Sequence, residues 1–416
     1  MNKMEFCVPL PCSGPTAQPL TMQPVGNQPP FTDHAQHQHE TADILWQWRL
    51  LALSHADDHA AVTLVEPQSP YWPWLGHRPW MQHIALQFPQ HMALELQFFA
   101  NGIWQGSAFL RASVDGREWY SLTSPYSPSY QWLAQLVPSQ RLRLLYDALS
   151  DLVPGWRTCQ LAPLAIDTHT ALHTALHIQD MTNLSSQHDT LHAYHAAQRW
   201  HHHYVASHNW TAGLKRQPDA LADYWQKRSS LLKNTIKRRQ KKLLAAGASW
   251  QIYHQIDAGL RDDYWRVYEH SWKSAEGCPE FINWLLDYAS TEGSLRLGVL
   301  RMDNQAIACQ LWLVQEQHAA IYKLAQDERY DAWSPGTVLT AAMIDAVLQH
   351  DQVVHIDFLT GNDRYKAQWM DAVQPQHGLM LYHHRQLQSR LGWYWQWTKN
   401  QLKRLRQDAL ATAAPL

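Results

Sequence analysis

Asp357 and Lys366 are the two residues whose types and spacing most directly suggest chemistry. They lie in the segment DFLTGNDRYKAQWMD, residues 357–371, which directly follows an apolar run that is predicted to be a strand. Open α/β sheets bind their ligands at such strand ends. If both side chains face a cleft, they can orient or deprotonate a nucleophile. An ion pair that only holds the loop is an equally good interpretation.

Three further residues of this segment complete the candidate site. Gly361 lets another group approach the backbone closely. Tyr365 and Trp369 can form pocket walls, although aromatic residues three to four positions apart are more often part of a core. The sequence therefore predicts either a polar strand-end site or a well-packed loop.

A second candidate site lies in YKLAQDERYDAWSPGT, residues 322–337. Ser334, Pro335, Gly336 and Thr337 open a predicted helix. The unpaired N–H groups and the positive dipole of a helix start attract phosphate, and Gly336 leaves room for a bulky anion. A capped helix start without a ligand is the alternative, because the segment lacks a full glycine-rich loop.

Residues 227–242 form a basic run without an acidic residue. Leu232, Ile236 and Leu243 recur there at helical spacing, so the charges form the opposite, solvated face of a helix. The basic residues are Lys227, Arg228, Lys233, Lys237, Arg238, Arg239, Lys241 and Lys242. A role toward cofactor phosphates or a polyanionic acceptor is the alternative. The formal net charge of the whole chain is −2, which speaks against DNA and against nucleic acids in general.

Histidine and cysteine give no metal or disulfide signal. His188, His192 and His195 share a predicted helical face, but 26 histidines are scattered along the chain, so compositional bias explains the cluster better than a metal site. The five cysteines form no CxxC pair, which predicts a reducing compartment. The first 20 residues make a poor signal peptide, and no run of 18 apolar residues occurs. We therefore expect a cytoplasmic protein that needs no metal.

Composition and length predict two globular lobes within the 416 residues. Residues 1–40, rich in Pro, Gln and His, are expected to be a disordered lead-in. We expect an N-terminal lobe over 41–210, a C-terminal lobe over 211–385, and a helix with a tail over 386–416. Alternating strands and helices indicate an α/β architecture.

The local patterns predict the individual elements. In the first lobe we expect a hairpin at Asn101-Gly102, helices over 139–152 and 167–178, and a strand over 156–164. In the second lobe we expect one long helix over 218–247, then helices over 260–274, 279–290, 334–350 and 386–409. Strands are predicted over 248–254, 294–301, 305–315, 319–325, 353–359 and 378–384, of which 294–325 form an antiparallel meander.

These pieces in order resemble a known family. TIKRRQKKLLAAG before a strand, then SWK, the meander, YKLAQDERYDAWSPGTVL and IDFLTGNDRYKAQW are similar to the CelD-like branch of the GNAT acetyltransferases, which is related to the Fem-type aminoacyl transferases of peptidoglycan. The resemblance covers residues 200–385 and implies an α/β (α+β) fold of tandem GNAT-like lobes, each a mixed, largely antiparallel sheet flanked by helices. It also implies transfer of an acyl group from acetyl-CoA or another acyl-CoA to an amine or hydroxyl.

The resemblance assigns roles to positions that match the family motifs. Lys323, Ser334, Gly336 and Thr337 are expected to bind the donor, and Trp272, Lys273, Gly361 and Trp369 the acceptor. Asp327 or Asp357 would be the base or the water relay, Tyr330 or Tyr365 the acid, and Lys366 the group that orients substrate or phosphate.

One departure keeps the donor open. Classical GNAT enzymes have a Gln/Arg-x-x-Gly-x-Gly/Ala loop, whereas this chain has DAWSPGT. A Fem-type transferase would instead use aminoacyl-tRNA, held by the basic run. A non-catalytic partner in envelope or polysaccharide assembly is a further alternative, and its C-terminal LGWYWQWTKNQLKRLR could lie on a membrane surface. The expected acceptor is a small molecule, such as an amino sugar, or a glycan precursor.

Overall fold

The computed structural model describes residues 36–41, 44–53, 78–130, 133–134, 138–164, 200–215 and 219–412. The chain divides into two compact units. Unit 1 contains Ser207–Pro375, and unit 2 contains Ala17–Ala206 and Gln376–Leu416. The boundaries fall within two strands, β8 (His201–Gly213) and β14 (Ala372–Tyr382), so each of these strands contributes residues to both units.

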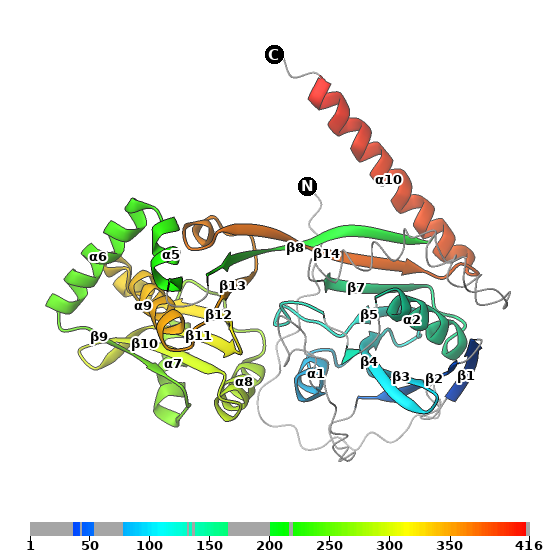
Figure 1. The fold of residues 1–416 in the computed structure, drawn as a ribbon, viewed down its shortest axis with the longest axis horizontal. Coiled ribbons are helices and arrows are strands. Elements are labelled where there is room, and N and C mark those ends of the chain that lie inside the picture. Colours follow the sequence, from blue (N-terminus) through cyan, green and yellow to red (C-terminus); the bar gives the residue numbers. More distant parts are fainter. Residues whose placement is uncertain are drawn as a thin grey trace. The chain divides into compact units, whose positions relative to one another are not determined.

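The sheet of unit 1 has the strand order β8-β13-β12-β11-β10-β9 (Figure 1). Its further strands are β9 (Ser249–Tyr253), β10 (Leu295–Met302), β11 (Gln305–Gln315), β12 (His318–Gln326) and β13 (His355–Thr360). Neighbouring strands pair antiparallel except β12 and β13, which pair in parallel. The predicted meander of three strands over 294–325 is confirmed.

Helices cover both faces of this sheet. They are α7 (Ala258–Glu269), α8 (Pro279–Thr291) and α9 (Pro335–Gln349). Side chains of successive strand residues point to opposite faces. Cys309 contacts the backbone of Asp263 in α7, whereas the next residue, Gln310, donates to the carbonyl of Gly336 and to Thr340 in α9. The two helices therefore lie on opposite faces (Figure 1).

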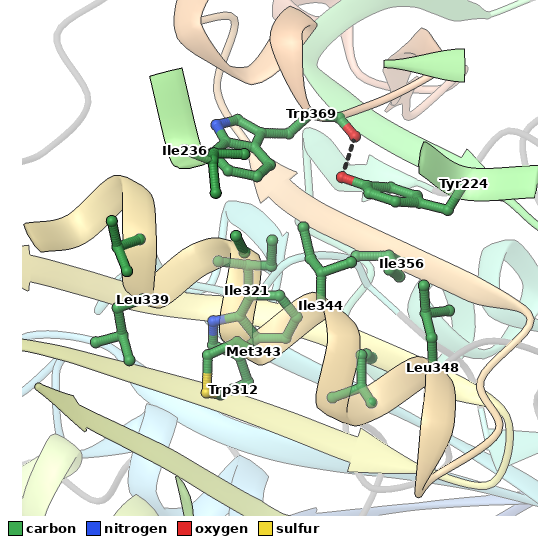
Figure 2. Packing of buried hydrophobic residues seen from close by; sticks show 14 of the residues in the cluster. Tyr224, Ile236, Trp312, Ile321, Leu339, Met343, Ile344, Leu348, Ile356 and Trp369 are labelled. Carbon is green, nitrogen blue, oxygen red and sulfur yellow. Dashed lines mark hydrogen bonds between the residues drawn. The ribbon is translucent and has the colours of Figure 1, made fainter. Parts of the chain in front are cut away.

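A buried apolar cluster joins α9 to the sheet (Figure 2). Trp312 of β11 and Ile321 of β12 are buried against Leu339 and Met343 of α9. A core side chain of this size contributes about 2 kcal/mol when it is fully buried. The cluster fixes α9 on the sheet, and so it fixes the start of α9 beside the end of β12.

The prediction of one long helix over 218–247 is wrong. The segment consists of α5 (Ala220–Lys227) and α6 (Ser230–Ala245). Arg228 and Ser229 are extended, and the Ser229 hydroxyl accepts a hydrogen bond from the Leu232 N–H. Serine is a strong N-cap because its oxygen satisfies an otherwise unpaired donor. The second helix therefore starts afresh at Ser229.

Unit 2 contains strands in the order β1-β2-β3-β4-β5-β7-β14, with β6 paired to β4. The bounds are β1 (Gln36–Thr41), β2 (Ile44–Ala52), β3 (Met92–Ala100), β4 (Ile103–Ala112), β5 (Glu118–Ser121), β6 (Leu133–Ala134) and β7 (Thr158–Leu164). Its helices are α1 (Arg78–Ala85), α2 (Pro138–Leu152) and α10 (Leu387–Thr412). The predicted hairpin is confirmed: Asn101 and Gly102 both have positive φ, as a two-residue β-hairpin turn requires.

Three smaller outcomes concern element bounds. The helix predicted over 260–274 ends at Glu269, where His270 caps it, and β14 begins at Ala372, before the predicted 378. Residues 36–40, placed at the end of the predicted lead-in, pair with β2 as part of β1. The helix predicted over 167–178, the histidines at 188, 192 and 195, and residues 1–35 lie outside the described residues.

The C-terminal helix α10 presents two different sides. Trp393 donates to the His201 carbonyl and contacts the Trp200 ring, while Ser389 is buried. The side chains of Trp395 and Trp397 are 64% and 50% exposed. Within the part of the chain that the structure describes, no helix is both long and apolar enough to cross a membrane.

Candidate functional site

β12 and β13 pair over a short stretch and then stop pairing. Their parallel register covers only three residue pairs, from His318 with His355 to Ala320 with Asp357. β12 continues to Gln326 and β13 to Thr360. The register of β12 against β11 shifts at the same place and leaves Tyr322 as the extra residue of a β-bulge. Beyond Ala320 the facing backbone edges of β12 and β13 are therefore not joined by ladder hydrogen bonds.

The start of α9 lies directly after β12 and a 3-10 turn, η2 (Glu328–Trp333). Ser334 has the left-handed φ of 53°, Pro335 is buried, and the Gly336 N–H donates to the Gln326 side-chain oxygen at 2.9 Å. A Cβ added at Gly336 would lie 2.5 Å from that oxygen. The Gln326 amide thus holds the position at which an anion would meet the helix, and an anion would have to displace it. Thr337 is half-buried in the same turn.

Asp327 caps η2. Its carboxylate accepts from the Arg329 N–H at 3.0 Å and pairs with the Arg329 guanidinium at 2.5 Å. The side-chain hydrogen bond from Arg329 lowers the pKa of Asp327, so this carboxylate is a weak proton acceptor. Tyr330 packs at the edge of the α9 cluster. This geometry favours a structural role for Asp327, and its assignment as the base stays a prediction.

Asp357 is a buried, fully engaged carboxyl group. It accepts from the Asn209 amide at 2.9 Å and from the Leu359 N–H at 2.6 Å. Burial raises its pKa to about 6. The oxygen of the Asn209 amide is buried and has no hydrogen-bond partner. Asp357 and Asn209 form a polar pair between β13 and β8, at the place where the register of these strands shifts.

Lys366 closes the loop that follows β13. Its Nζ donates to the carbonyls of Phe358 at 3.2 Å, Leu359 at 3.5 Å and Thr360 at 3.0 Å, and Asp363 lies at 3.8 Å. Only 4% of Lys366 is exposed. The predicted Asp357–Lys366 ion pair is replaced by these backbone contacts. They hold the positive φ of Leu359, so Lys366 acts as a lock on the end of β13.

The other residues of the opening segment separate into core and surface. Trp369 is buried, and its carbonyl accepts from the Tyr224 hydroxyl at 2.9 Å (Figure 2). This placement indicates a packing role, and contact with an acceptor stays a prediction. Tyr365 is 43% exposed with its ring edge against Phe358. Gly361 has φ of 126°, and a Cβ there would lie 2.9 Å from Lys366 Nζ.

A charged cluster that includes two predicted residues lies near the separated strands. Lys323 of β12 pairs with Glu276 at 2.8 Å. Lys273 Nζ lies 5.6 Å from the centre of the Tyr268 ring and 5.8 Å from that of Trp272. Trp272 itself is 52% exposed. Glu276 could not be predicted from the sequence, because a lone glutamate in a polar loop carries no distinguishing spacing.

The basic helix α6 has both engaged and free cations. Arg239 donates to the Ala332 carbonyl, and Lys242 lies over the Trp333 ring at 4.0 Å, so both contact η2. Lys237, Arg238 and Lys241 are exposed. A cavity of about 630 Å³ lies between α6, α9 and β9. Lys233 and Lys237 of the basic run line this cavity, but none of the residues predicted to be catalytic or to bind the donor or the acceptor does.

The structure offers no metal centre within its described residues. No three His, Cys, Asp or Glu side chains gather there as a metal ion would require. Cys159, Cys278 and Cys309 are buried, and burial raises the pKa of the Cys159 and Cys309 thiols. These thiols are therefore poor nucleophiles.

Comparisons with known proteins identify a similar family domain over part of the chain and a similar fold. Residues 230–367 match the family model described as an acetyltransferase (GNAT) domain, which contains every predicted site residue except Trp369. The structure of FemX is similar at 9% identity with a TM-score of 0.51, over 77% of this chain and 94% of that one. No curated protein sequence matches the chain.

Two further solved structures are similar at lower scores. A tandem GNAT protein from the clavulanic acid biosynthesis pathway has 13% identity and a TM-score of 0.41, over 81% of this chain and 98% of that one. L-PGS from Bacillus licheniformis has 8% identity and a TM-score of 0.41, over 76% and 90%. The predicted fold class, a mixed and mostly antiparallel α/β protein with flanking helices, is confirmed, whereas the CelD-like branch stays a prediction.

Proposed function

We propose that this chain is an acyltransferase that moves an acyl group from an acyl-CoA, acetyl-CoA among them, to an amine. The observation that carries the proposal is the separation of β12 from β13 at Ala320 and Asp357, beside the start of α9. A thioester donor can insert between two such strands, with its carbonyl at the backbone edge of β12 and its phosphates at the helix start.

Donor binding in this proposal needs one local rearrangement. The Gln326 side chain leaves the Gly336 N–H, and a phosphate oxygen takes its place. Lys323, on the strand segment past the bulge, supplies a nearby positive charge. The acceptor is expected to be a small amine such as an amino sugar, or a glycan precursor, received near the exposed Trp272. No metal is needed for this chemistry.

Calorimetric titration with acetyl-CoA and with free CoA tests the proposal. We expect micromolar binding by the unchanged protein and its loss in Gly336→Glu, because the added carboxylate repels phosphate at the helix start. Gly155→Glu is the matched control, since a Cβ at Gly155 meets no atom within 4 Å. No binding of either ligand to a folded protein would refute the acyl-CoA donor.

A Fem-type transferase that takes its acyl group from aminoacyl-tRNA is the second candidate. Two observations favour it: the fold shared with FemX, and the exposed cations Lys237, Arg238 and Lys241 of α6. If tRNA is the donor carrier, its affinity should fall steeply with salt and weaken when these three residues become Gln. Binding of tRNA that is equally tight in that variant would exclude the α6 surface.

A non-catalytic role in envelope or polysaccharide assembly would leave both donors unbound. The exposed Trp395 and Trp397 of α10, with Lys399 over the Trp395 ring, would then be the first surface to test for peripheral membrane contact. Sedimentation with anionic vesicles, repeated on a variant with both tryptophans replaced by Ser, measures this contact. The cytoplasmic location stays a proposal alongside it.

A further inference from the structure

Three lysine side chains come together beside the separated strands, and two of them have partners. Lys366 is bonded to three backbone carbonyls, and Lys323 is paired with Glu276. Among the described residues, the Nζ of Lys273 has neither a hydrogen bond nor an ion pair, and it lies near the rings of Tyr268 and Trp272. Lys273 is thus the lysine of this cluster whose amine makes no hydrogen bond or ion pair among the described residues.

The surroundings of Lys273 disfavour its charged form. The side chain is half-buried, and the two aromatic rings replace only part of the water that an ammonium group would bind. Lys323 and Lys366 add positive charge, and Glu276 and Asp363 only partly offset it. Burial, which has the largest effect, and the charge of Lys323, which has the next largest, lower the pKa of Lys273 to about 8. A usable fraction of Lys273 is therefore neutral near pH 7 to 8.

Lys273 is also in the right place to meet the reacting groups. Its amine neighbours Lys323, which directly follows the bulge residue Tyr322 on β12. The bulge marks the point past which β12 and β13 no longer pair. A donor inserted between these strands would bring its carbonyl to this point. Trp272, the exposed neighbour of Lys273, leaves this side open to a second substrate.

We infer that Lys273 is the proton acceptor of the acyl transfer, an assignment that rests on the proposed function. The neutral Nζ takes a proton from the ammonium group of the acceptor and becomes an ammonium itself. The freed amine attacks the thioester carbonyl, so that a C–N bond forms and the C–S bond breaks. The proton on Lys273 returns to the departing thiolate, and the excess proton on the new amide nitrogen passes to water. Lys273 is again neutral and ready for the next turnover.

A covalent role for Lys273 is excluded by the same chemistry. If its amine attacked the thioester, the product would be an amide of Lys273, which does not pass its acyl group on. Transfer would end after one event. A proton acceptor, by contrast, is restored in each cycle, and such a group typically contributes a factor of about 10² to 10⁴ in rate.

Reactivity of the amine gives a test that needs no known acceptor. The protein is labelled briefly with sulfosuccinimidyl acetate between pH 6 and pH 10, and each lysine peptide is quantified by mass spectrometry. We expect half-maximal labelling of Lys273 near pH 8 and protection of Lys273 by acetyl-CoA. The control is Lys215, an exposed lysine of the same unit with an ion pair to Asp223 at 3.4 Å. The labelling of Lys215 should be the same with and without acetyl-CoA.

The outcomes separate the two proposals. A midpoint near 10 for Lys273 would overturn the inference while leaving calorimetric donor binding intact. A midpoint near 8 with no acetyl-CoA binding would refute the proposed function, and the role of Lys273 with it.

Steady-state kinetics then tests the role itself, with acetyl-CoA as donor and the acceptor amine that the turnover assay supports. We expect Lys273→Arg, which keeps the charge but cannot deprotonate at working pH, to lower kcat at least 100-fold with unchanged donor affinity. It should also lose the rise of kcat with pH. Lys215→Arg should match the unchanged protein. A Lys273→Arg protein that keeps both its rate and its pH dependence would overturn the inference.

Discussion

Each unit contains a pair of parallel strands joined through a helix, and the two pairs end differently. In unit 2, β5 and β7 pair from Glu118 with Thr158 to Tyr120 with Gln160. Past this point, the hydroxyl groups of Ser121 and Thr123 donate to the Ala162 carbonyl at 2.8 and 2.7 Å. In unit 1, the ladder between β12 and β13 ends after Ala320 and Asp357, and the charged side chains of Lys323 and Lys366 lie past this point.

The difference separates a closed strand end from an open one. The hydroxyl bridges of unit 2 continue the connection between β5 and β7 by side chains, and Trp119, Tyr130 and Cys159 are fully buried around them. Apolar, hydrogen-bonded surroundings of this kind favour a structural role. The same strand–helix–strand arrangement thus stabilises one unit and provides a candidate binding site in the other, and the side chains at the strand ends decide which.

The largest effect should come from the lysine that holds the open end in shape. We expect Lys366→Met to lower the free energy of unfolding by about 4 kcal/mol, because three buried carbonyls lose a charged donor. Urea denaturation followed by tryptophan fluorescence measures this loss. Lys241→Met, an exposed lysine of α6, is the control and should change the stability by less than about 0.5 kcal/mol.

The activity of the Lys366 variant sharpens the comparison. If acyl transfer disappears in Lys366→Met while the unfolding free energy stays within 1 kcal/mol of the unchanged protein, then Lys366 acts on a substrate, as the family resemblance implies. If stability and activity fall together, the residue is a lock, and the open end of unit 1 depends on it much as the closed end of unit 2 depends on its hydroxyl groups.

Substitution of Asp357 should change the free energy of unfolding by a smaller amount, and it should raise the stability instead of lowering it. The folded-state pKa of Asp357, about 6, lies above the ordinary value near 4, so the folded protein favours the protonated form. The stability that this proton provides is complete below pH 4 and is lost as the pH rises through 6. Asp357→Asn stays neutral throughout. We therefore expect this variant to gain up to about 3 kcal/mol over the unchanged protein between pH 4 and pH 7.

The variant can keep its hydrogen bonds because the Asn209 amide can turn over. Its unpartnered oxygen would then accept from the new amide at 357, while the Leu359 N–H still donates to the remaining oxygen. Thermal unfolding at pH 4, 5, 6 and 7 measures the difference. An Asn variant that is less stable than the unchanged protein at pH 7 would contradict the burial cost and favour an ionised, well-paired carboxylate.

The elements of unit 1 could be predicted from the sequence because each has a local signal. The meander follows from short apolar runs separated by turn residues, and the start of α9 follows from Pro335. The break between α5 and α6 depends on Ser229 alone, inside a strongly helical pattern, so the local signal was outweighed. Residue types drew attention to Asp357 and Lys366, and the family resemblance drew attention to Lys273 and Lys323.

The hydrogen-bond and ion-pair partners of these charged residues could not be predicted, because such partners depend on tertiary contacts. Glu276 reaches Lys323 across 47 positions of the sequence, and Asn209 reaches Asp357 across 148. Lys366 bonds to backbone carbonyls, which carry no sequence signal at all. Sequence alone therefore identifies the charged residues, and only the fold tells which of them is satisfied and which, like Lys273, is left with an unpaired amine.

The smallest effect tests the closed end of unit 2. We expect Thr123→Ala to lower the free energy of unfolding by about 1 kcal/mol, because the Ala162 carbonyl keeps its second donor, Ser121. Replacing Ser121 as well should cost more than two single losses, since the carbonyl is then left without either hydroxyl. Donor binding, measured by calorimetry with acetyl-CoA, should not change in either variant. Weaker acetyl-CoA binding after removal of these hydroxyls would mean that unit 2 takes part in donor recognition, and the division between a closed and an open strand end would no longer separate structure from function.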